Sequence, residues 1–301
     1  MVPVCVQFCG EHLGPDQVQW VCAGLDRAQL LSLRGCRVSD QDFGRICESA
    51  ARSRTLVQLN LSLGVASGPD RIKDLARALD QNRSLQTLFL HGNRLSGPES
   101  LVLTRSLVLH PALVSLDLGD CSLTDQVLNQ VCGLLPPDGA RPGLQELSLS
   151  SNPGVSARAW TRLCVALAHS AQLRVLRLDY NPLGDRIAEM LAVAVASSRT
   201  LETLDLEGTG LSNQTGQVFL DLLLFYPVSL KVLVLAENQI SPEVQTQIQD
   251  LLSESEDEPI RDQRLQQQPI REERDWLPHS GAHTVLLTSG LGDSLLDETE
   301  M

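Results

Sequence analysis

Hydrophobic and polar positions alternate in short stretches of this chain, and each stretch is followed by a longer one with a different period. The segment from Leu173 to Thr200 contains both patterns. Leu176 and Leu178 are separated by one residue, which predicts a strand with both leucines on one face. Beyond them, apolar residues recur every three or four positions, which predicts a helix with a buried stripe at Ile187, Met190, Leu191, Ala194 and Val195.

This strand-and-helix unit recurs along most of the chain. Units begin at residues 28, 56, 85, 113, 144, 173, 201 and 230, which are 28 to 31 residues apart. Neither element can bury its apolar face alone, so the repetition predicts units stacked into a curved parallel sheet with helices outside it. We predict about nine strands, counting a degenerate first unit in which Val4, Val6 and Cys9 match the strand and turn positions.

The repetition divides the chain into three parts. Residues 1–27 are predicted to form an N-terminal capping repeat and residues 28–252 the regular repeats. Residues 253–301 have no apolar period, which predicts a disordered acidic C-terminal tail. The last helix should run from Pro242 to Leu252.

Particular side chains are expected to stabilise the turns and helix starts. Asn181 follows its strand, and its amide can bind turn backbone groups that would otherwise be buried without partners. Cys36 and Cys121 occupy the same position in their repeats. An acid lies three residues after each of three serines, which predicts capping boxes at Ser39, Ser67 and Ser96.

The units LQTLFLHGNRL, LRVLRLDYNPL and LKVLVLAENQI resemble the leucine-rich repeats of ribonuclease inhibitor, which also occur at the C-termini of NOD-like receptors. This resemblance covers roughly residues 28–252. It implies an α/β leucine-rich-repeat solenoid, a horseshoe with parallel strands on the concave face and helices on the convex face. Such repeats serve inhibitors, receptors, actin-capping proteins and GTPase activators, so the resemblance implies a fold and leaves the function open.

The charge of the chain is acidic and unevenly distributed. The net charge is −13, and the 12 acids and 4 bases of residues 253–301 account for −8 of it. Because phosphates select clustered Lys and Arg, this balance predicts no binding to nucleic acid or to anionic membranes. The first residues lack a basic segment followed by an apolar one, which predicts no secretory signal and a cytoplasmic location. The eight cysteines are then expected to be reduced.

A partner-binding surface is expected on the concave face, where the outward side chains of consecutive strands form a grid. Acids outnumber bases by five to two at these positions, which predicts a basic protein partner. The rings of Phe89 and Tyr180 are expected to be its anchors. The alternative is that the acids only solvate an exposed sheet face. The candidate residues are Phe89, His91, Asp117, Asp120, Glu146, Arg177, Asp179, Tyr180, Asp205 and Glu207.

These patterns favour a non-enzymatic intracellular protein-binding scaffold or adaptor. Catalysis is not expected, because carboxylates on an open sheet should stay solvated, without the desolvation that tunes an acid or base. No cofactor or metal site is predicted either, since Cys5 and Cys9 lack the second pair that zinc needs. The alternative is a GTPase-activating or other catalytic regulator of a partner, because Ran GTPase-activating proteins share this repeat type and an acidic C-terminal region.

Several aromatic residues and histidines are assigned structural roles. Trp20, Phe43, Trp160 and Phe219 fall in predicted helices, which favours packing roles. His110 and His169 follow helices, where a cation suits the negative end of the helix dipole.

The tail contains one short motif of its own. Thr299 and Met301 match the C-terminal ligands of PDZ domains, in which a terminal apolar residue fills a pocket while the peptide adds a strand to a sheet. The sequence therefore suggests a PDZ domain as a second partner.

Overall fold

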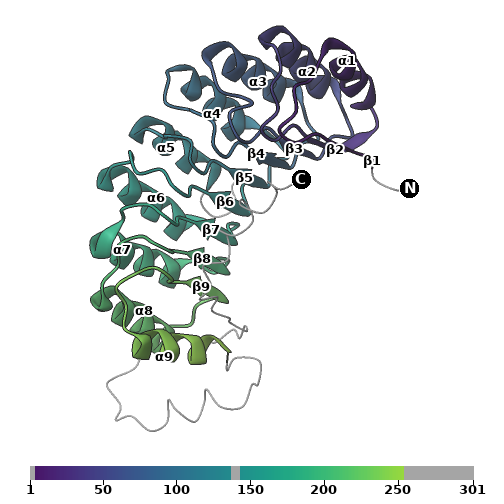
Figure 1. The fold of residues 1–301 in the computed structure, drawn as a ribbon. Coiled ribbons are helices and arrows are strands. Elements are labelled where there is room, and N and C mark those ends of the chain that lie inside the picture. Colours follow the sequence, from purple (N-terminus) through teal and green to yellow (C-terminus); the bar gives the residue numbers. More distant parts are fainter. Residues whose placement is uncertain (1–3, 137–142, 254–301) are drawn as a thin grey trace, which may run out of the picture.

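The computed structural model is an arc of strands lined on its outer side by helices (Figure 1). The structure describes residues 4–136 and 143–253. Within them one sheet holds nine strands in chain order: β1 (Val4–Gln7), β2 (Ala28–Ser32), β3 (Gln58–Asn60), β4 (Thr87–Phe89), β5 (Ser115–Asp117), β6 (Glu146–Ser148), β7 (Val175–Arg177), β8 (Thr203–Asp205) and β9 (Val232–Val234).

A helix follows each strand and covers the outer side of the sheet (Figure 1). The helices are α1 (Pro15–Gly24), α2 (Asp40–Arg52), α3 (Pro69–Gln81), α4 (Glu99–Leu109), α5 (Asp125–Val131), α6 (Ala157–His169), α7 (Gly184–Ser197), α8 (Asn213–Phe225) and α9 (Pro242–Ser253). A short 3-10 helix, Cys132–Leu134, extends α5. This arrangement confirms the predicted α/β horseshoe, with parallel strands inside and helices outside.

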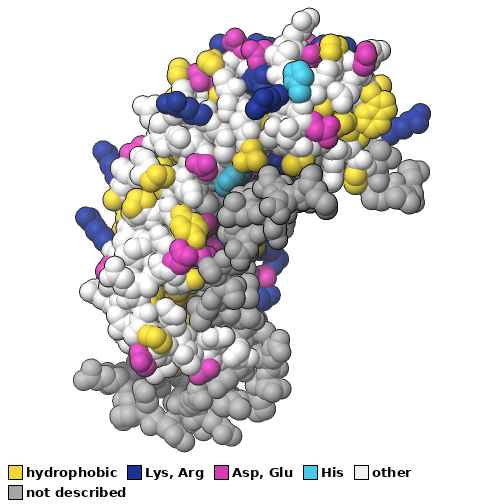
Figure 2. All heavy atoms as spheres, viewed as in Figure 1, with side chains coloured by type: hydrophobic (Ala, Val, Ile, Leu, Met, Phe, Trp, Pro, Cys, Tyr) yellow, Lys and Arg dark blue, Asp and Glu magenta, His cyan; other side chains and the backbone are white. Residues whose placement is uncertain are grey.

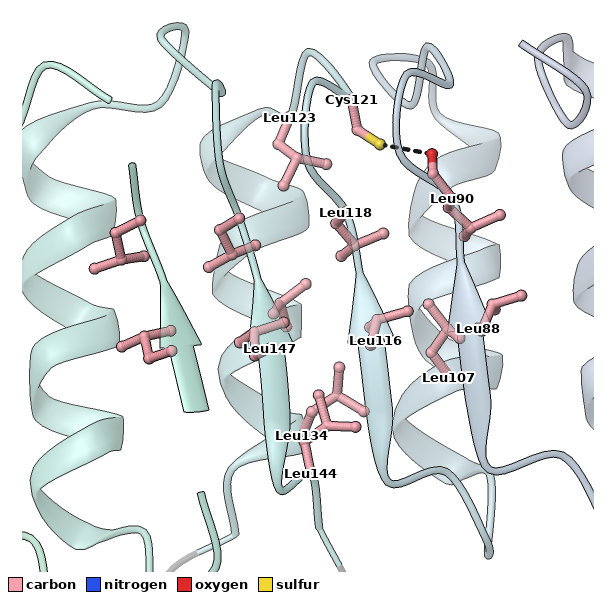
Figure 3. Packing of buried hydrophobic residues seen from close by; sticks show 14 of the residues in the cluster. Leu88, Leu90, Leu107, Leu116, Leu118, Cys121, Leu123, Leu134, Leu144 and Leu147 are labelled. Atoms are coloured by element: carbon pink, nitrogen blue, oxygen red, sulfur yellow. Dashed lines mark hydrogen bonds between the residues drawn. The ribbon is translucent and has the colours of Figure 1, made fainter. Parts of the chain in front are cut away.

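The central leucine of each regular strand lies beside the same leucine of the next strand. Leu176 pairs with Leu147 on one side and with Leu204 on the other, and all three are fully buried. Figure 3 shows the equivalent leucines of neighbouring strands, Leu88, Leu116 and Leu147, which belong to one buried hydrophobic cluster. Each buried leucine contributes about 1.5–3 kcal/mol relative to an exposed one, so most of the stability comes from this repeated layer.

Asparagines at the turn position join several turns to the turn before them. Asn181 is 1% exposed, and its Nδ2 donates to the carbonyl oxygens of Leu149 (3.0 Å) and Leu178 (2.8 Å). Its Oδ1 accepts from the backbone N–H of Asn152 (2.7 Å), which confirms the predicted role. At the same position, the Sγ of Cys121 lies 3.2 Å from the carbonyl oxygen of Leu90, so a thiol replaces the amide there (Figure 3).

The residue before this turn position has a positive φ in eight successive repeats. Three of the eight are glycines, for which a left-handed backbone carries no steric cost. The other five have a side chain, which the turn projects at the edge of the sheet. The eight residues are Gly35, Leu63, Gly92, Asp120, Ser151, Tyr180, Gly208 and Glu237.

Three local predictions were wrong. Gly10 donates to the carbonyl oxygen of Arg34, and Gln7 pairs with Ser32, so Cys9 lies two residues before the turn position that Glu11 occupies. The helices α3 and α4 have Gly68 and Pro98 as N-caps instead of Ser67 and Ser96.

Ser67, which follows β3, forms a hydrogen bond with the neighbouring repeat. The Oγ of Ser67 accepts from the backbone N–H of Arg94 (3.1 Å), so it stabilises a loop of the next unit instead of its own helix. Ser39 is the N-cap of α2, because its Oγ accepts from the N–H of Asp42 (3.1 Å). The Asp42 carboxylate accepts from the same Oγ (2.8 Å), so the N-cap half of this predicted capping box is confirmed.

The aromatic packing prediction holds for three residues of four. Phe43, Trp160 and Phe219 are fully buried, but Trp20 is 61% exposed and meets only the edge of the Phe8 ring among the described aromatic side chains. Among the described residues, β1 is hydrogen-bonded to one strand, β2, whereas β2 to β8 each lie between two strands. Most of the predicted tail lies outside the described residues, and Ser253 is the last residue of α9.

We expect Asn181→Ala to lower the free energy of unfolding by about 2–4 kcal/mol. The buried carbonyl of Leu178 and the N–H of Asn152 would lose this partner, and the carbonyl of Leu149 would keep only the Nδ2 of Asn152. Asn60→Ala is the matched control, since the Asn60 side chain is half-buried and accepts from Ser62 on the concave face. It should cost under about 1 kcal/mol. Urea unfolding curves measure both values, and equal losses would contradict this role of the turn amide.

Candidate functional site

The strand register places the candidate residues in rows that run across the concave face. One row holds neighbours from β4 to β8, each paired with the next: Phe89, Asp117, Ser148, Arg177 and Asp205. The residues two places further along each strand form a second row, because their backbone carbonyls accept hydrogen bonds from the preceding repeat. This row is His91, Gly119, Ser150, Asp179 and Glu207. Because neighbouring strands are about 4.8 Å apart, side chains in adjacent places of a row are in contact range.

Three carboxylates at the β7 and β8 ends of these rows form an acidic cluster, which we define as Asp179, Asp205 and Glu207. They are 9%, 7% and 4% exposed. Asp179 accepts a hydrogen bond from the Oγ of Ser150 (2.5 Å), and Asp205 accepts one from the N–H of Glu207 (3.0 Å). The expectation that these carboxylates stay solvated was therefore wrong.

Burial and neighbouring charges change the pKa of Asp205. Burial raises the pKa of Asp205 to about 6, and the negative charges of Asp179 and Glu207 add to the effect. The N–H of Glu207 and the charge of Arg177 oppose the shift without cancelling it. In this cluster, carboxylates of like charge lie close together although their electrostatic repulsion is unfavourable.

Tyr180 projects from the edge of the sheet beside this cluster. Its φ is +55° and its side chain is 45% exposed, while its hydroxyl donates to the Oε1 of Glu207 (2.9 Å). Gly208, with φ +60°, leaves room for the ring, because a Cβ there would lie 2.9 Å from a Tyr180 ring carbon. Burial of the hydroxyl and the contact with Glu207 raise the pKa of Tyr180. The ring therefore helps to cover Glu207 and still offers an apolar surface.

A second polar group lies in the same rows at β4 and β5. The Nδ1 of His91 is 3.8 Å from the Oδ1 of Asp117, which also accepts from the N–H of Gly119 (2.8 Å). The interaction with Asp117 raises the pKa of His91. Burial pushes the pKa of Asp117 upward, but His91 and the hydrogen bond from Gly119 outweigh it and hold that pKa below its usual range.

Serines occupy the rows between the two groups. The hydroxyls of Ser148 and Ser150 are 3.1 Å apart, and Ser150 continues to Asp179. Phe89 is half-buried beside Asp117. The concave face thus has a His91–Asp117 pair at one place and an acidic cluster at another, joined by hydroxyl groups.

Other candidates do not join these groups. Glu146 lies in a different row, is exposed, and accepts from the Oγ of Ser115 (3.0 Å). Asp120 lies at the edge of the sheet, in a left-handed turn. Phe89 and Tyr180 are on β4 and just after β7, about 15 Å apart across three strand spacings. The two rings are therefore separate anchors instead of one.

The sequence analysis missed Leu63, a third exposed side chain at this edge. It has a φ of +63° and is 45% exposed. Gly92 occupies the same place in the next repeat, and a Cβ there would lie 3.2 Å from a methyl group of Leu63. Gly35 and Gly92 hold the equivalent position in the repeats on either side of Leu63. These two glycines could have identified Leu63 from the sequence, because they leave space for its side chain.

The acidic cluster lies along the β7 and β8 ends of the two rows on the concave face. Two hollows among the described residues, of about 470 and 540 Å³, lie between α4 and α5 and between α2 and α3, and neither includes the cluster. Among these residues no group of three or more His, Cys, Asp or Glu side chains could hold a metal ion. Figure 2 shows acidic and hydrophobic side chains interleaved over the middle repeats. The surface suits an extended ligand.

The prediction of a cationic His110 was wrong. Its side chain is buried, and burial together with the charge of Arg83 lowers its pKa to about 4, so it is neutral at neutral pH. Its Nδ1 accepts from the N–H of Ala112 (3.3 Å), as Ser53 and Asn82 accept from the residue two places on. His110 is therefore a hydrogen-bond acceptor after α4.

Comparison with known proteins defines the class. The family model described as Leucine Rich repeat matches residues 169–192. Ribonuclease inhibitor of Mus musculus is 27% identical to this chain, over 79% of it and 59% of the inhibitor. The yeast Rad7 and Elc1 complex includes a chain of similar fold, with a TM-score of 0.54 and 17% identity over 79% of this chain and 58% of that one. The protein is a leucine-rich-repeat solenoid.

One relative matches along the whole sequence. Leucine-rich repeat-containing protein 73 of Homo sapiens is 56% identical over 316 aligned positions, which cover 100% of both chains. The chain belongs to the leucine-rich repeat-containing protein 73 family. Short segments such as LSLRGC, LDLGDC and LDYNPLGD carry the same resemblance.

Some expectations stay predictions. Thr299 and Met301 lie outside the described residues, so the PDZ ligand stays a prediction. A regulator of GTPases, which rests on architectural analogy, also stays one, as does the absence of nucleic-acid binding. In the described part of the chain, every helix is too short or too polar to cross a bilayer.

We expect Asp205→Asn to raise the free energy of unfolding by about 1–2 kcal/mol above pH 7, because the amide removes a like charge and can still accept from Glu207. A raised folded-state pKa means that the folded protein binds more protons than the unfolded chain between about pH 4 and pH 6, so wild-type stability falls as pH rises through that window. The gain should therefore vanish at about pH 4.

Thermal unfolding at the two pH values measures this difference. Asp80→Asn, at an exposed carboxylate of α3, is the matched control and should change stability little at either pH. A destabilised Asp205→Asn protein at neutral pH would contradict the assignment.

Proposed function

We propose that this protein is an intracellular, non-enzymatic scaffold that binds a basic segment of another protein on its concave face. The observation that carries the proposal is the acidic cluster. Asp179, Asp205 and Glu207 are at least nine-tenths buried, and Arg177 is the one cation among the influences on Asp205. Such an arrangement lowers the stability of the fold. Destabilising groups of this kind are typical of functional sites.

The geometry supports an Arg- or Lys-containing peptide in particular. The negative charge of carboxylates on adjacent strands attracts a guanidinium, which donates hydrogen bonds through a planar fork. The exposed ring of Tyr180 adds an apolar and aromatic contact at the edge of the cluster. Leu63 offers a further apolar contact four repeats away, so an extended partner could meet both.

The concave face is also rigid. The turn amides and the leucine layers fix the strands, so binding requires little reorganisation of the backbone. The open face without an enclosing pocket favours binding over chemistry, since it holds no small substrate away from water.

The test is a selection of short random peptides displayed on phage against the full chain. Arg- and Lys-containing sequences should be enriched, since long-range attraction and local ion pairs both favour them. A cluster variant with Asp179→Asn, Asp205→Asn and Glu207→Gln should lose this enrichment.

A control variant with Asp80→Asn, Glu243→Gln and Asp250→Asn removes the same charge from exposed helix positions, and it should behave as the wild type. Equal enrichment on the cluster and control variants would mean that net charge alone attracts the peptides, and the proposal would then fail.

A further inference from the structure

The strand β9 lies at the end of the arc and is hydrogen-bonded, within the described residues, to one strand, β8 (Figure 1). In the eight preceding units, the N–H of the second inward residue donates to a carbonyl of the next unit. Leu178 donates in this way to Asp205 (3.0 Å), and Leu206 donates to Val234 (3.0 Å). Leu235 holds this position after β9, and in the described part of the chain its N–H has no acceptor.

A second N–H on the same edge also lacks an acceptor among the residues that the structure describes. The residue before the turn position donates to the next unit as well, Tyr180 to Glu207 (2.8 Å) and Gly208 to Ala236 (3.0 Å). Glu237 holds this position after β9 and is exposed, so water can reach it. Leu235 is fully buried, so its N–H is shielded from water. A buried N–H is normally paired, and an unpaired strand edge accepts a further strand.

One segment of the chain beyond α9 has the pattern of a strand of this fold. Residues 253–301 as a whole have no apolar period, but Thr284–Thr288 reads Thr-Val-Leu-Leu-Thr. Val285 and Leu287 are separated by one residue, as the two strand leucines are in each regular unit. Three of the five residues are β-branched, which favours an extended backbone. The segment has no charged side chain, so pairing it with β9 would bury no charge.

The chain between α9 and this segment is long enough to bring it to β9. Each helix is followed by a return to the start of the next strand, as α7 ends at Ser197 and β8 begins at Thr203. Residues 254–283 lie between α9 and the segment. They span up to about 100 Å when extended, whereas α9 is about 18 Å long. The entropy cost of closing a loop grows slowly with its length, so the longer connection is tolerated.

We propose that Thr284–Thr288 adds a tenth parallel strand to the open edge of β9 and closes the end of the solenoid. In the register of the other strands, Val234 pairs with Leu286, whose carbonyl accepts from the N–H of Leu235. The N–H of Glu237 then donates to the carbonyl at the end of the segment. The tether keeps the segment at a high local concentration, which favours it over another molecule. This ordered segment is an exception to the disorder predicted for the tail.

The added strand has a consequence for the whole molecule. The end units of a repeat protein need a cap, because an open edge can pair with another chain and lead to aggregation. The inference is independent of the proposed function, since it concerns the end of the sheet and leaves the acidic cluster as it is.

The test is hydrogen exchange of single backbone amides, measured by NMR in the full chain. Glu237 is the sharper reporter, because an exposed residue with a free N–H exchanges rapidly. In the wild type, Leu235 and Glu237 should exchange as slowly as Gly208, whose N–H is paired. Val285→Lys with Leu287→Lys puts charges at the inward positions, and it should speed exchange at Glu237 by at least about tenfold. Gly208 should stay slow, which shows that the variant is folded.

The control variant, Thr284→Lys with Thr288→Lys, adds the same charge at outward positions of the segment and should keep Glu237 slow. Rapid exchange at Glu237 in the wild type would mean that the edge is open, and the inference would fail. Equal acceleration by both variants would show that the segment does not alternate as a strand. Protection that disappears on dilution would assign the edge to a second copy of the chain, which also contradicts the inference.

Discussion

The structure depends on the way each turn amide joins two consecutive repeats. Asn181 binds carbonyls of its own turn and of the preceding one, and Asn152 and Asn238 repeat the arrangement. These buried contacts fix the offset between neighbouring units, so leucine meets leucine throughout the core. A repeat that slipped would leave carbonyls unpaired and expose apolar side chains at once. Stacking in register is therefore strongly favoured over any alternative.

The same register determines the chemistry of the concave face. Residues at equivalent positions are brought within about 5 Å whether or not their charges match. Arg177 pairs with Asp205 across the strands and its charge offsets part of the negative charge there, but Asp179 and Glu207 add further negative charge. The scaffold is stable enough to carry this repulsion, because the leucine layers contribute most of the folding free energy. Binding chemistry can thus vary on a fold that stays constant.

The fold could be predicted from the sequence because leucine spacing reports directly on which side of each element is buried. Composition could not reveal the environment of the acids, since burial of Asp205 depends on neighbours contributed by other repeats. Leu63, in a left-handed turn, was missed for a similar reason. The residues adjacent to it in sequence do not mark it as exposed, and only the glycines in the neighbouring repeats indicate the space that its side chain occupies. His110 follows a helix as predicted, yet tertiary burial keeps its imidazole neutral.

The central claim is that the register gathers carboxylates whose charges repel. It is tested most directly by carbon-13 NMR titration of the Asp205 side-chain carboxyl in the full chain. The account predicts a pKa of about 6 in the wild type. Asp179→Asn should lower it, because one neighbouring negative charge is gone. An ordinary value near 4 that Asp179→Asn leaves unchanged would contradict the claim.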